Sequence, residues 1–205
     1  MNLQPSSLSD GVELVPAPVT DRRDASRTRT VFRVARVLAR DDEGLARIRN
    51  ISDGGMRLKL GIPVVAGDTI EVAMSETQAF LGRVVWAKDG ECGIQFAEWV
   101  DSVAALQSAA EDTRAGRSRP PRLLASQPVV VETERGLCVT QMRDISQHGM
   151  KITNDGSFKP GLAVKILIGP GVERRGYVRW ATNNMAGLIL TEPLTVEELG
   201  SVSAL

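Results

Sequence analysis

The sequence predicts an all-β protein made of two tandem, small antiparallel β-barrels, each followed by a short helix. Three observations lead to this fold class: an internal repeat, apolar residues that recur at every second position, and turn residues at short intervals. The chain has 205 residues, which leaves room for two domains of about 100 residues each. We therefore expect two copies of one small fold.

The repeat is visible as two related segments. Residues 49–57 read RNISDGGMR and residues 143–151 read RDISQHGMK, an offset of 94 residues (144 − 50). The same offset continues without a gap and aligns Gly67 with Gly161, Gly82 with Gly176, Trp86 with Trp180 and Gly93 with Gly187. A register held over this length indicates duplication of one domain. We expect the copies to span residues 21–113 and 114–205, after a mobile tail at residues 1–20.

Strands are predicted where apolar and polar residues alternate. In the first copy this occurs over residues 56–60 and 70–74, and in the second over residues 150–152 and 164–168. A period of two places one side of each segment in a core and the other in water, as in a half-buried strand. Turn residues separate the segments, at 41–44, 61–63, 66–68, 89–90, 154–156 and 159–161. Short strands with such turns are typical of an antiparallel sandwich or barrel.

One helix is predicted at the end of each copy. Residues 101–114 are rich in alanine, with apolar residues near helical spacing, Asp101 as the N-cap and Gly116 as the stop. In the second copy, Thr195 and Glu198 have the spacing of a capping box that leads into Leu199.

Charge balance and aromatic content argue against nucleic acid as a partner. Lys and Arg number 25 and Asp and Glu also number 25, so no overall field attracts DNA or RNA. Aromatic residues make up 4% of the chain, which leaves few rings to stack on bases. A hydrophobic fraction of 42% and a charged fraction of 24% indicate a soluble chain without membrane insertion. Residues 1–19 lack the pattern of a secretion signal, so we expect a cytoplasmic protein.

The sequence offers no set of residues for catalysis or for metal binding. His148 is the single histidine and has no Cys or carboxylate near it at ligand spacing. We therefore expect neither a bound metal nor enzymatic activity. His148 is expected at the surface or partly buried, without a functional role. The two cysteines, Cys92 and Cys138, are expected to be free thiols in a reducing compartment. Trp86 and Trp180 lie in valine-rich segments and are expected in the cores.

Two half-motifs stand in the first copy. Arg23 and Arg27 form an Arg-x-x-x-Arg pattern, and 23 positions (50 − 27) after Arg27 comes Asn-x-Ser-x-x-Gly at Asn50, Ser52 and Gly55. Their joint occurrence on a β-rich repeat resembles the signature of the PilZ domain family. Trp86 and the segment 93–96 are also similar to family features. The resemblance covers residues 21–110, and more loosely residues 117–205.

The resemblance implies a β-barrel receptor or adaptor that binds the bacterial second messenger cyclic di-GMP, without metal or other cofactor. Arg23 and Arg27 would contact the ligand, because arginine pairs in a bidentate way with phosphate or with a guanine edge and also stacks on a base. Arg22, which directly precedes the pattern, is associated in the family with capture of a stacked pair of ligand molecules. Such a receptor would pass the signal to a protein effector.

The turn residues of the motif also suit this ligand. Asn50 and Ser52 offer short donors and acceptors to a guanine edge. Gly55 allows either a positive φ or a close backbone approach. An ordinary hairpin remains the alternative, in which Ser52 satisfies the backbone of the turn.

The second copy departs from the family pattern. Asp144, Ser146 and Gly149 are intact, but the offset places Pro121 where the first copy has Arg27. The nearby arginines, Arg119 and Arg122, have the wrong spacing, and the prolines between them favour an extended path. We expect this copy to be a structural or interaction partner. A second, weaker site that uses Arg119 or Arg122 is the alternative.

Three classes of function therefore stay open, of which the third, a nucleic-acid binder that uses the arginine-rich stretch 22–49, is disfavoured by the low aromatic content and the zero net charge. The leading hypothesis is a cyclic di-GMP receptor that binds through the first copy. The alternative is a ligand-independent PilZ-like module for protein interaction. The sequence does not decide whether the chain acts as a monomer or as a homodimer.

Overall fold

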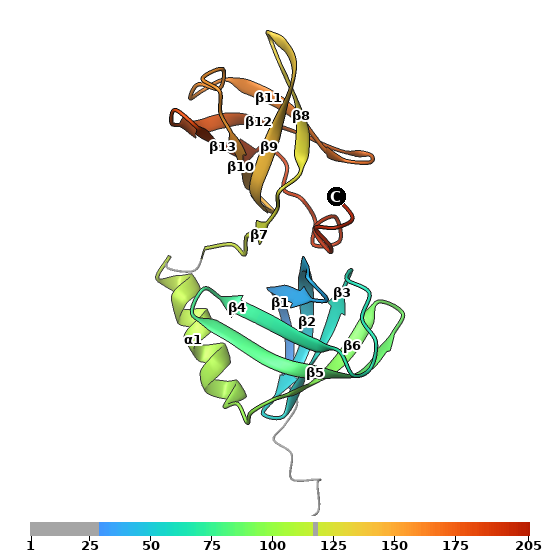
Figure 1. Ribbon diagram of the computed structural model, residues 1–205. Helices are drawn as coiled ribbons and strands as arrows, with labels where there is room; N and C mark the ends of the chain where they lie inside the picture. Colours follow the sequence, from blue (N-terminus) through green and yellow to red (C-terminus); the bar gives the residue numbers. More distant parts are fainter. Residues whose placement is uncertain (1–28, 117–118) are drawn as a thin grey trace, which may run out of the picture.

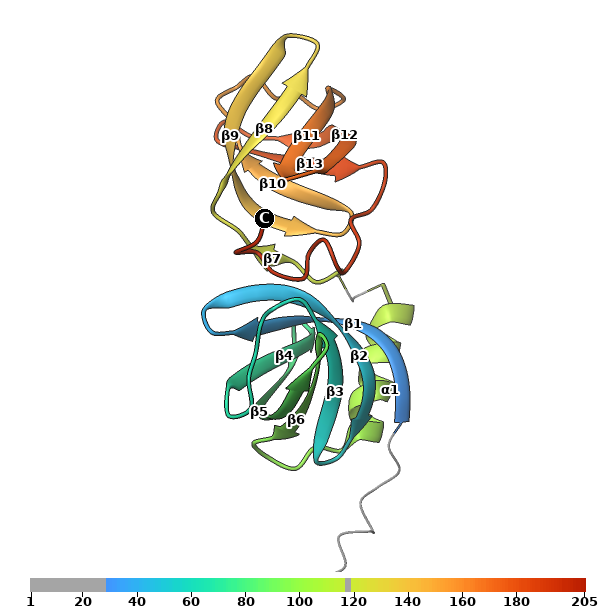
Figure 2. The same ribbon diagram turned by 90° about the vertical axis from the view of Figure 1, so that its right-hand side faces the viewer.

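The protein forms two β-barrels stacked end to end, with one helix along the side of the first (Figures 1 and 2). This architecture comes from a computed structural model, which describes residues 29–116 and 119–205. All strand pairs in both barrels are antiparallel. The predicted fold class, two tandem small antiparallel barrels, is confirmed.

The first barrel is a closed ring of six strands in the order β1-β2-β3-β6-β5-β4. Pairing of β1 with β4 closes the ring. The strands are β1 (Arg29–Ala39), β2 (Asp42–Ser52), β3 (Gly55–Leu60), β4 (Thr69–Ser75), β5 (Gln78–Lys88) and β6 (Glu91–Phe96). Both segments predicted from alternation in the first copy are strands, β3 and β4.

The second barrel repeats this ring with the order β8-β9-β10-β13-β12-β11, closed by the pairing of β11 with β8. A short strand, β7 (Leu123–Leu124), lies outside the ring along β9. The ring strands are β8 (Pro128–Thr133), β9 (Gly136–Ser146), β10 (Gly149–Thr153), β11 (Ala163–Gly169), β12 (Val172–Ala181) and β13 (Met185–Leu190). The shared strand order shows that the sequence repeat is a repeat of structure.

Each barrel has its own apolar core, formed by the inward side of the alternating strands. On β3, Met56, Leu58 and Leu60 are buried while Arg57 and Lys59 are exposed. Both thiols are free: Cys92 lies in the first core, where burial raises its pKa to about 11, and the half-buried Cys138 packs against the second core.

The helix predicted for the first copy is present as α1 (Ser102–Arg114). Asp101 is the N-cap, and its carboxylate accepts hydrogen bonds from the N–H groups of Val103 (3.0 Å) and Ala104 (2.9 Å). Gly116, with φ +66°, follows the end of the helix. In the described part of the chain, no helix combines the length and the apolar composition of a transmembrane span.

The prediction of a helix at the end of the second copy is wrong. The capping box does form, because Thr195 N–H donates to Glu198 Oε2 (2.7 Å) and Glu198 N–H donates to Thr195 Oγ1 (3.0 Å). It encloses a single turn, however, because the backbone that would continue the helix bonds to the first barrel instead. Leu199 O accepts a hydrogen bond from Leu45 N–H (2.7 Å), and Val202 N–H donates to Glu43 O (2.7 Å).

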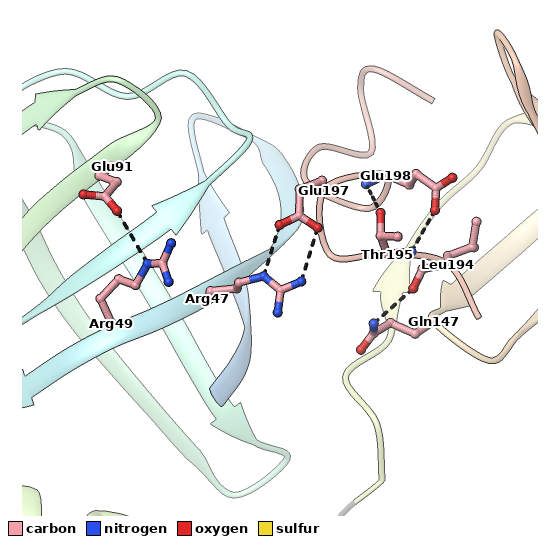
Figure 3. A network of polar contacts seen from close by, with 8 residues as sticks. All are labelled: Arg47, Arg49, Glu91, Gln147, Leu194, Thr195, Glu197 and Glu198. Carbon is pink, nitrogen blue, oxygen red and sulfur yellow. Dashed lines mark hydrogen bonds and ion pairs between the residues drawn. The ribbon is translucent and has the colours of Figure 1, made fainter. Parts of the chain in front are cut away.

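This C-terminal segment, residues 195–205, joins the two barrels. Arg47 on β2 donates from Nε to Glu197 Oε1 (3.1 Å; Figure 3). Ser201 Oγ donates to Asp42 Oδ2 (2.6 Å). Leu45, also on β2, is 1% exposed and belongs to the apolar core of the second barrel rather than the first. The chain therefore crosses back from its last residues to the start of β2.

Candidate functional site

The motif residues of the first copy lie at the turn between β2 and β3. Ser52 Oγ donates to Gly55 O across this turn (3.3 Å). A Cβ on Gly55 would lie 2.2 Å from the carbonyl oxygen of Ile94 on β6, so glycine is required by close backbone approach. Gly55 does not belong to the residues with positive φ. Of the two roles that the sequence allowed for this glycine, the structure shows the close approach.

Asn50 lies at the end of β2, half-buried, and lines a shallow cavity of about 370 Å³ with Ser52 and Gly55. Its side-chain amide forms no hydrogen bond with any described residue. The hydroxyl of Ser52 is used by the turn as a donor, but its oxygen can still accept. The turn thus presents one unengaged amide and one oriented hydroxyl to the cavity.

Trp86 lines the same cavity, which corrects the expectation that it lies in the core. It is 41% exposed, and so is Trp180 in the second barrel. In each barrel the ladder shifts register next to this tryptophan, after Val84 on β5 and after Val178 on β12. This irregularity breaks the alternation, so the valine points inward and the tryptophan outward.

A glycine beneath each tryptophan makes room for the ring. A Cβ on Gly93 would lie 2.1 Å from Trp86 Nε1, and a Cβ on Gly187 would lie 2.1 Å from Trp180 Nε1. Arg57 places its guanidinium 5.7 Å from the centre of the Trp86 ring. Each barrel therefore carries an exposed aromatic face beside its motif turn.

The carboxylate of Glu91 holds the cations next to this aromatic face. Arg49 Nε lies 3.5 Å from Glu91 Oε1 (Figure 3). On the other side, Arg57 Nε donates to Glu91 Oε2 (3.1 Å). Hydrogen bonding by Arg57, followed by the charges of Arg57 and Arg49, lowers the pKa of Glu91. Both arginines are thus already paired with a carboxylate.

Three predicted ligand residues, Arg22, Arg23 and Arg27, lie outside the described residues. The strand that follows them is described, and β1 begins beside the motif turn: Arg29 is the register partner of Ile51, and Thr30 that of Asn50. The described chain therefore starts next to the Asn50 cavity.

Asp53 has a role that the sequence analysis missed. Its carboxylate accepts hydrogen bonds from Ser102 N–H (3.1 Å) and Ser102 Oγ (2.6 Å), and its carbonyl accepts one from Val100 N–H (3.0 Å). The motif turn is thereby tied to the start of α1. The second barrel repeats the backbone hydrogen bond 94 positions later, where Leu194 N–H donates to Gln147 O (2.7 Å), but no local sequence pattern indicates either contact.

The second barrel has the larger cavity, about 720 Å³, at the equivalent place. Ser146 Oγ donates to Gly149 O (3.0 Å), as in the first copy, and Gly149 is again required by close approach, here to Leu188 O. The carboxylate of Asp144 is 9% exposed and forms ion pairs with Lys151 (2.6 Å) and with Arg122. His148 is exposed at the rim, as expected.

The arm that leads into the second barrel reaches its cavity. Arg119 and Arg122 both line it, together with Trp180. Within the described ranges, no three His, Cys, Asp or Glu side chains are grouped as metal ligands.

Comparison with known proteins gave a family and a set of similar folds. The family model of the PilZ domain matches twice, over residues 21–107 and 116–203. No curated protein matches the chain significantly.

Similar solved structures include PlzA of Borreliella burgdorferi in complex with c-di-GMP, at 10% identity and a TM-score of 0.39, covering 82% of this chain and 86% of that one. MotI/DgrA of Bacillus subtilis, an inhibitor of motility, is 15% identical with a TM-score of 0.33, covering 82% and 91%. YcgR of Escherichia coli in complex with c-di-GMP is 13% identical with a TM-score of 0.30, covering 77% and 75%.

Proposed function

Because the chain belongs to the PilZ domain family along both of its halves, we propose that it is a cyclic di-GMP receptor that binds its ligand at the first barrel. The receptor makes or breaks no covalent bond; it recognises the nucleotide and passes binding on to a protein effector.

The observation that carries this proposal is the arrangement beside the motif turn. The unengaged amide of Asn50, the hydroxyl of Ser52 and the exposed face of Trp86 line one cavity. An amide and a hydroxyl can bond the edge of a guanine, and an indole face can stack on its plane. The arginine arm precedes β1, which starts at this cavity.

The arm would supply the positive charge that the cavity lacks. Arg49 and Arg57 are held by Glu91 and offer little free charge to an anion. Arg23 and Arg27 would therefore take the phosphates, with bidentate hydrogen bonds. Arg22 would add a third cation, which offsets the repulsion between two stacked ligand molecules.

α1 offers a route by which binding could be passed on. The first residue of the helix, Ser102, donates hydrogen bonds to Asp53 of the motif turn. Near its other end, Arg33 on β1 donates to Ala109 O (2.8 Å) and to Thr113 Oγ1 (3.1 Å). A ligand that reorders the turn or the start of β1 would act on both ends of one helix.

Calorimetric titration with cyclic di-GMP tests the site. Arg23→Ala or Arg27→Ala is expected to weaken binding roughly tenfold to a hundredfold, since each removes a charge-assisted contact of about 1.5–3 kcal/mol. Arg135→Ala, an exposed arginine on the turn between β8 and β9, is the matched control and should bind like the parent. Circular dichroism should be unchanged in all three variants.

Arg22→Leu adds a count of ligands to the same titration. We expect one cyclic di-GMP molecule fewer per chain, with binding retained. Parent-like affinity in both Arg23→Ala and Arg27→Ala would contradict the site. Absence of any binding to the parent would favour the ligand-independent interaction module instead.

A further inference from the structure

The cavity of the second barrel differs in charge from that of the first. Arg119, Arg122, Lys151 and Arg179 line it, against the single carboxylate of Asp144. That carboxylate is already neutralised by Arg122 and Lys151. The cavity therefore carries an excess of positive charge, which an anion would balance.

Two of these cations are not engaged by any residue that the structure describes. Arg119 and Arg179 are exposed, and neither forms a hydrogen bond or ion pair with any residue in the described part of the chain. A guanidinium free of protein acceptors keeps all five of its N–H donors for a ligand. In the first barrel, by contrast, the cavity-lining cation Arg57, the counterpart of Lys151, is bound by Glu91.

The 94-residue register shows where this charge comes from. Arg179 stands where the first barrel has Val85, and both residues line the cavities of their barrels. The second copy has Pro121 in place of the arm residue Arg27. A guanidinium absent from the arm is thus present on strand β12 of the barrel wall.

A flat aromatic face completes the cavity. Trp180 is 41% exposed, and Gly187 beneath it leaves the ring in a defined position. An indole face can stack on any nucleobase, because every base has a π-face. The volume of about 720 Å³ is within the range of roughly 300–1,000 Å³ for small-molecule sites.

We infer that the second barrel is a separate site for a purine nucleotide phosphate, in which Arg119 and Arg179 hold the phosphate and Trp180 stacks on the base. This site goes beyond the proposed function, which assigns binding to the first barrel. It does not use the Arg-x-x-x-Arg pattern. Arg122 has a positioning role, because its ion pair removes the negative charge of Asp144 from the path of the ligand.

Tryptophan fluorescence can report on this cavity alone if Trp180, which lines it, is the only tryptophan left in the chain. The chain has three tryptophans, so the Trp86→Phe/Trp99→Phe variant leaves Trp180 as the only one. We expect a saturable change of its emission on titration with cyclic di-GMP, with GMP, or with both. A response to GMP assigns the site to mononucleotides as well, and a response to cyclic di-GMP alone assigns it to the second messenger. If the emission of Trp180 changes with neither nucleotide, the proposed site is overturned.

Substitutions in this single-tryptophan background locate the phosphate contact. Arg179→Val introduces the residue of the first barrel and should weaken the nucleotide response at least tenfold; Arg119→Ala should act in the same direction. Arg175→Val removes the same charge from the same strand outside the cavity and should have no effect. An unchanged response in both Arg179→Val and Arg119→Ala contradicts the phosphate assignment. Circular dichroism confirms that each variant is folded.

Addition of Arg23→Ala and Arg27→Ala to this background separates the two sites. The Trp180 response is expected to persist, because it does not depend on the arm of the first barrel. Its loss would show that it only reports binding at the first barrel and would overturn the second site. Conversely, calorimetry could show that the first barrel does not bind cyclic di-GMP while the Trp180 emission still responds to nucleotide. The two proposals can therefore fail separately.

Discussion

At the scale of single residues, the motif turn places two adjacent glycines in opposite surroundings. A Cβ on Gly55 would meet the Ile94 carbonyl oxygen at 2.2 Å, whereas a Cβ on Gly54 would have no atom within 4 Å. The equivalent of Gly54 in the second copy is His148, whose side chain is exposed. The turn therefore accepts a side chain at its third position and excludes one at its last.

Gly55→Ala is expected to destabilise the protein by about 1–3 kcal/mol, the usual cost of forcing extra atoms into a packed site. Gly54→Ala is the matched control and should change the free energy of unfolding by less than about 0.5 kcal/mol, as is usual for surface positions. Urea denaturation measures both. Equal effects of the two substitutions would show that the close approach to β6 is not the constraint on Gly55.

At the scale of elements, the C-terminal turn of residues 195–198 is held by the carboxylate of Glu198. Glu198 accepts hydrogen bonds from Thr195 N–H (2.7 Å) and from Arg174 Nη2 (2.7 Å) on β12. The hydrogen bond from Thr195, followed by the interaction with Arg174, lowers the pKa of Glu198. This single carboxylate thus connects the capped turn to the second barrel.

The lowered pKa predicts a pH dependence. A carboxyl group with a depressed pKa in the folded state stabilises the fold fully above its unfolded pKa of about 4.3, and this stability is lost as pH falls through the folded pKa. Glu198→Gln should therefore lower the free energy of unfolding by roughly 1–2 kcal/mol at pH 7. The difference from the parent should shrink below about pH 4.

Urea denaturation at pH 7 and at pH 3.5 checks this expectation. Glu173→Gln is a suitable control, because Glu173 is also paired with a cation, Lys165 (3.0 Å), but its side chain is 53% exposed. A gap between parent and Glu198→Gln that is the same at both pH values would contradict the role of the ionised carboxylate.

At the scale of the whole molecule, the two barrels are joined through residues of the first barrel that pack into the core of the second, with Leu45 the fully buried one. Leu45, near the start of β2, packs in the core of the second barrel, while Asn50 and Ser52 at the other end of β2 lie at the cavity of the first. The same strand bonds to the C-terminal segment through Asp42 and Arg47. We therefore expect the barrels to unfold together.

Leu45→Ala should uncouple them. Removal of a buried leucine side chain lowers the free energy of unfolding by about 2–5 kcal/mol. At Leu45 the lost contacts are those between the two barrels. We expect one calorimetric unfolding transition in the parent and two separate transitions in the variant. Leu137→Ala, at a leucine that is 72% exposed, is the control and should keep a single transition. Two transitions in the parent would contradict the coupling.

The features that depend on local pattern could be predicted from the amino-acid sequence. The 94-residue repeat, the alternation along β3, β4, β10 and β11, and the cap at Asp101 each rest on neighbouring residues, and the structure contains all of them. The position of the motif turn followed in the same way. Such signals can be read from a chain because the side-chain period of a strand and the chemistry of a cap are set within a few residues.

The contacts across strands and between barrels could not be predicted in this way, because they depend on how distant segments fold together. Trp86 and Trp180 face outward because the ladders slip by one residue beside them, which no alternation reveals. The C-terminal capping box starts only a single helical turn, because the N–H of Leu45 donates to the carbonyl oxygen of Leu199. The charge of the second cavity likewise depends on Arg119 and Arg179, 60 positions apart, meeting at one surface. In each case the competing partner is distant in the chain, so its effect is absent from the local sequence.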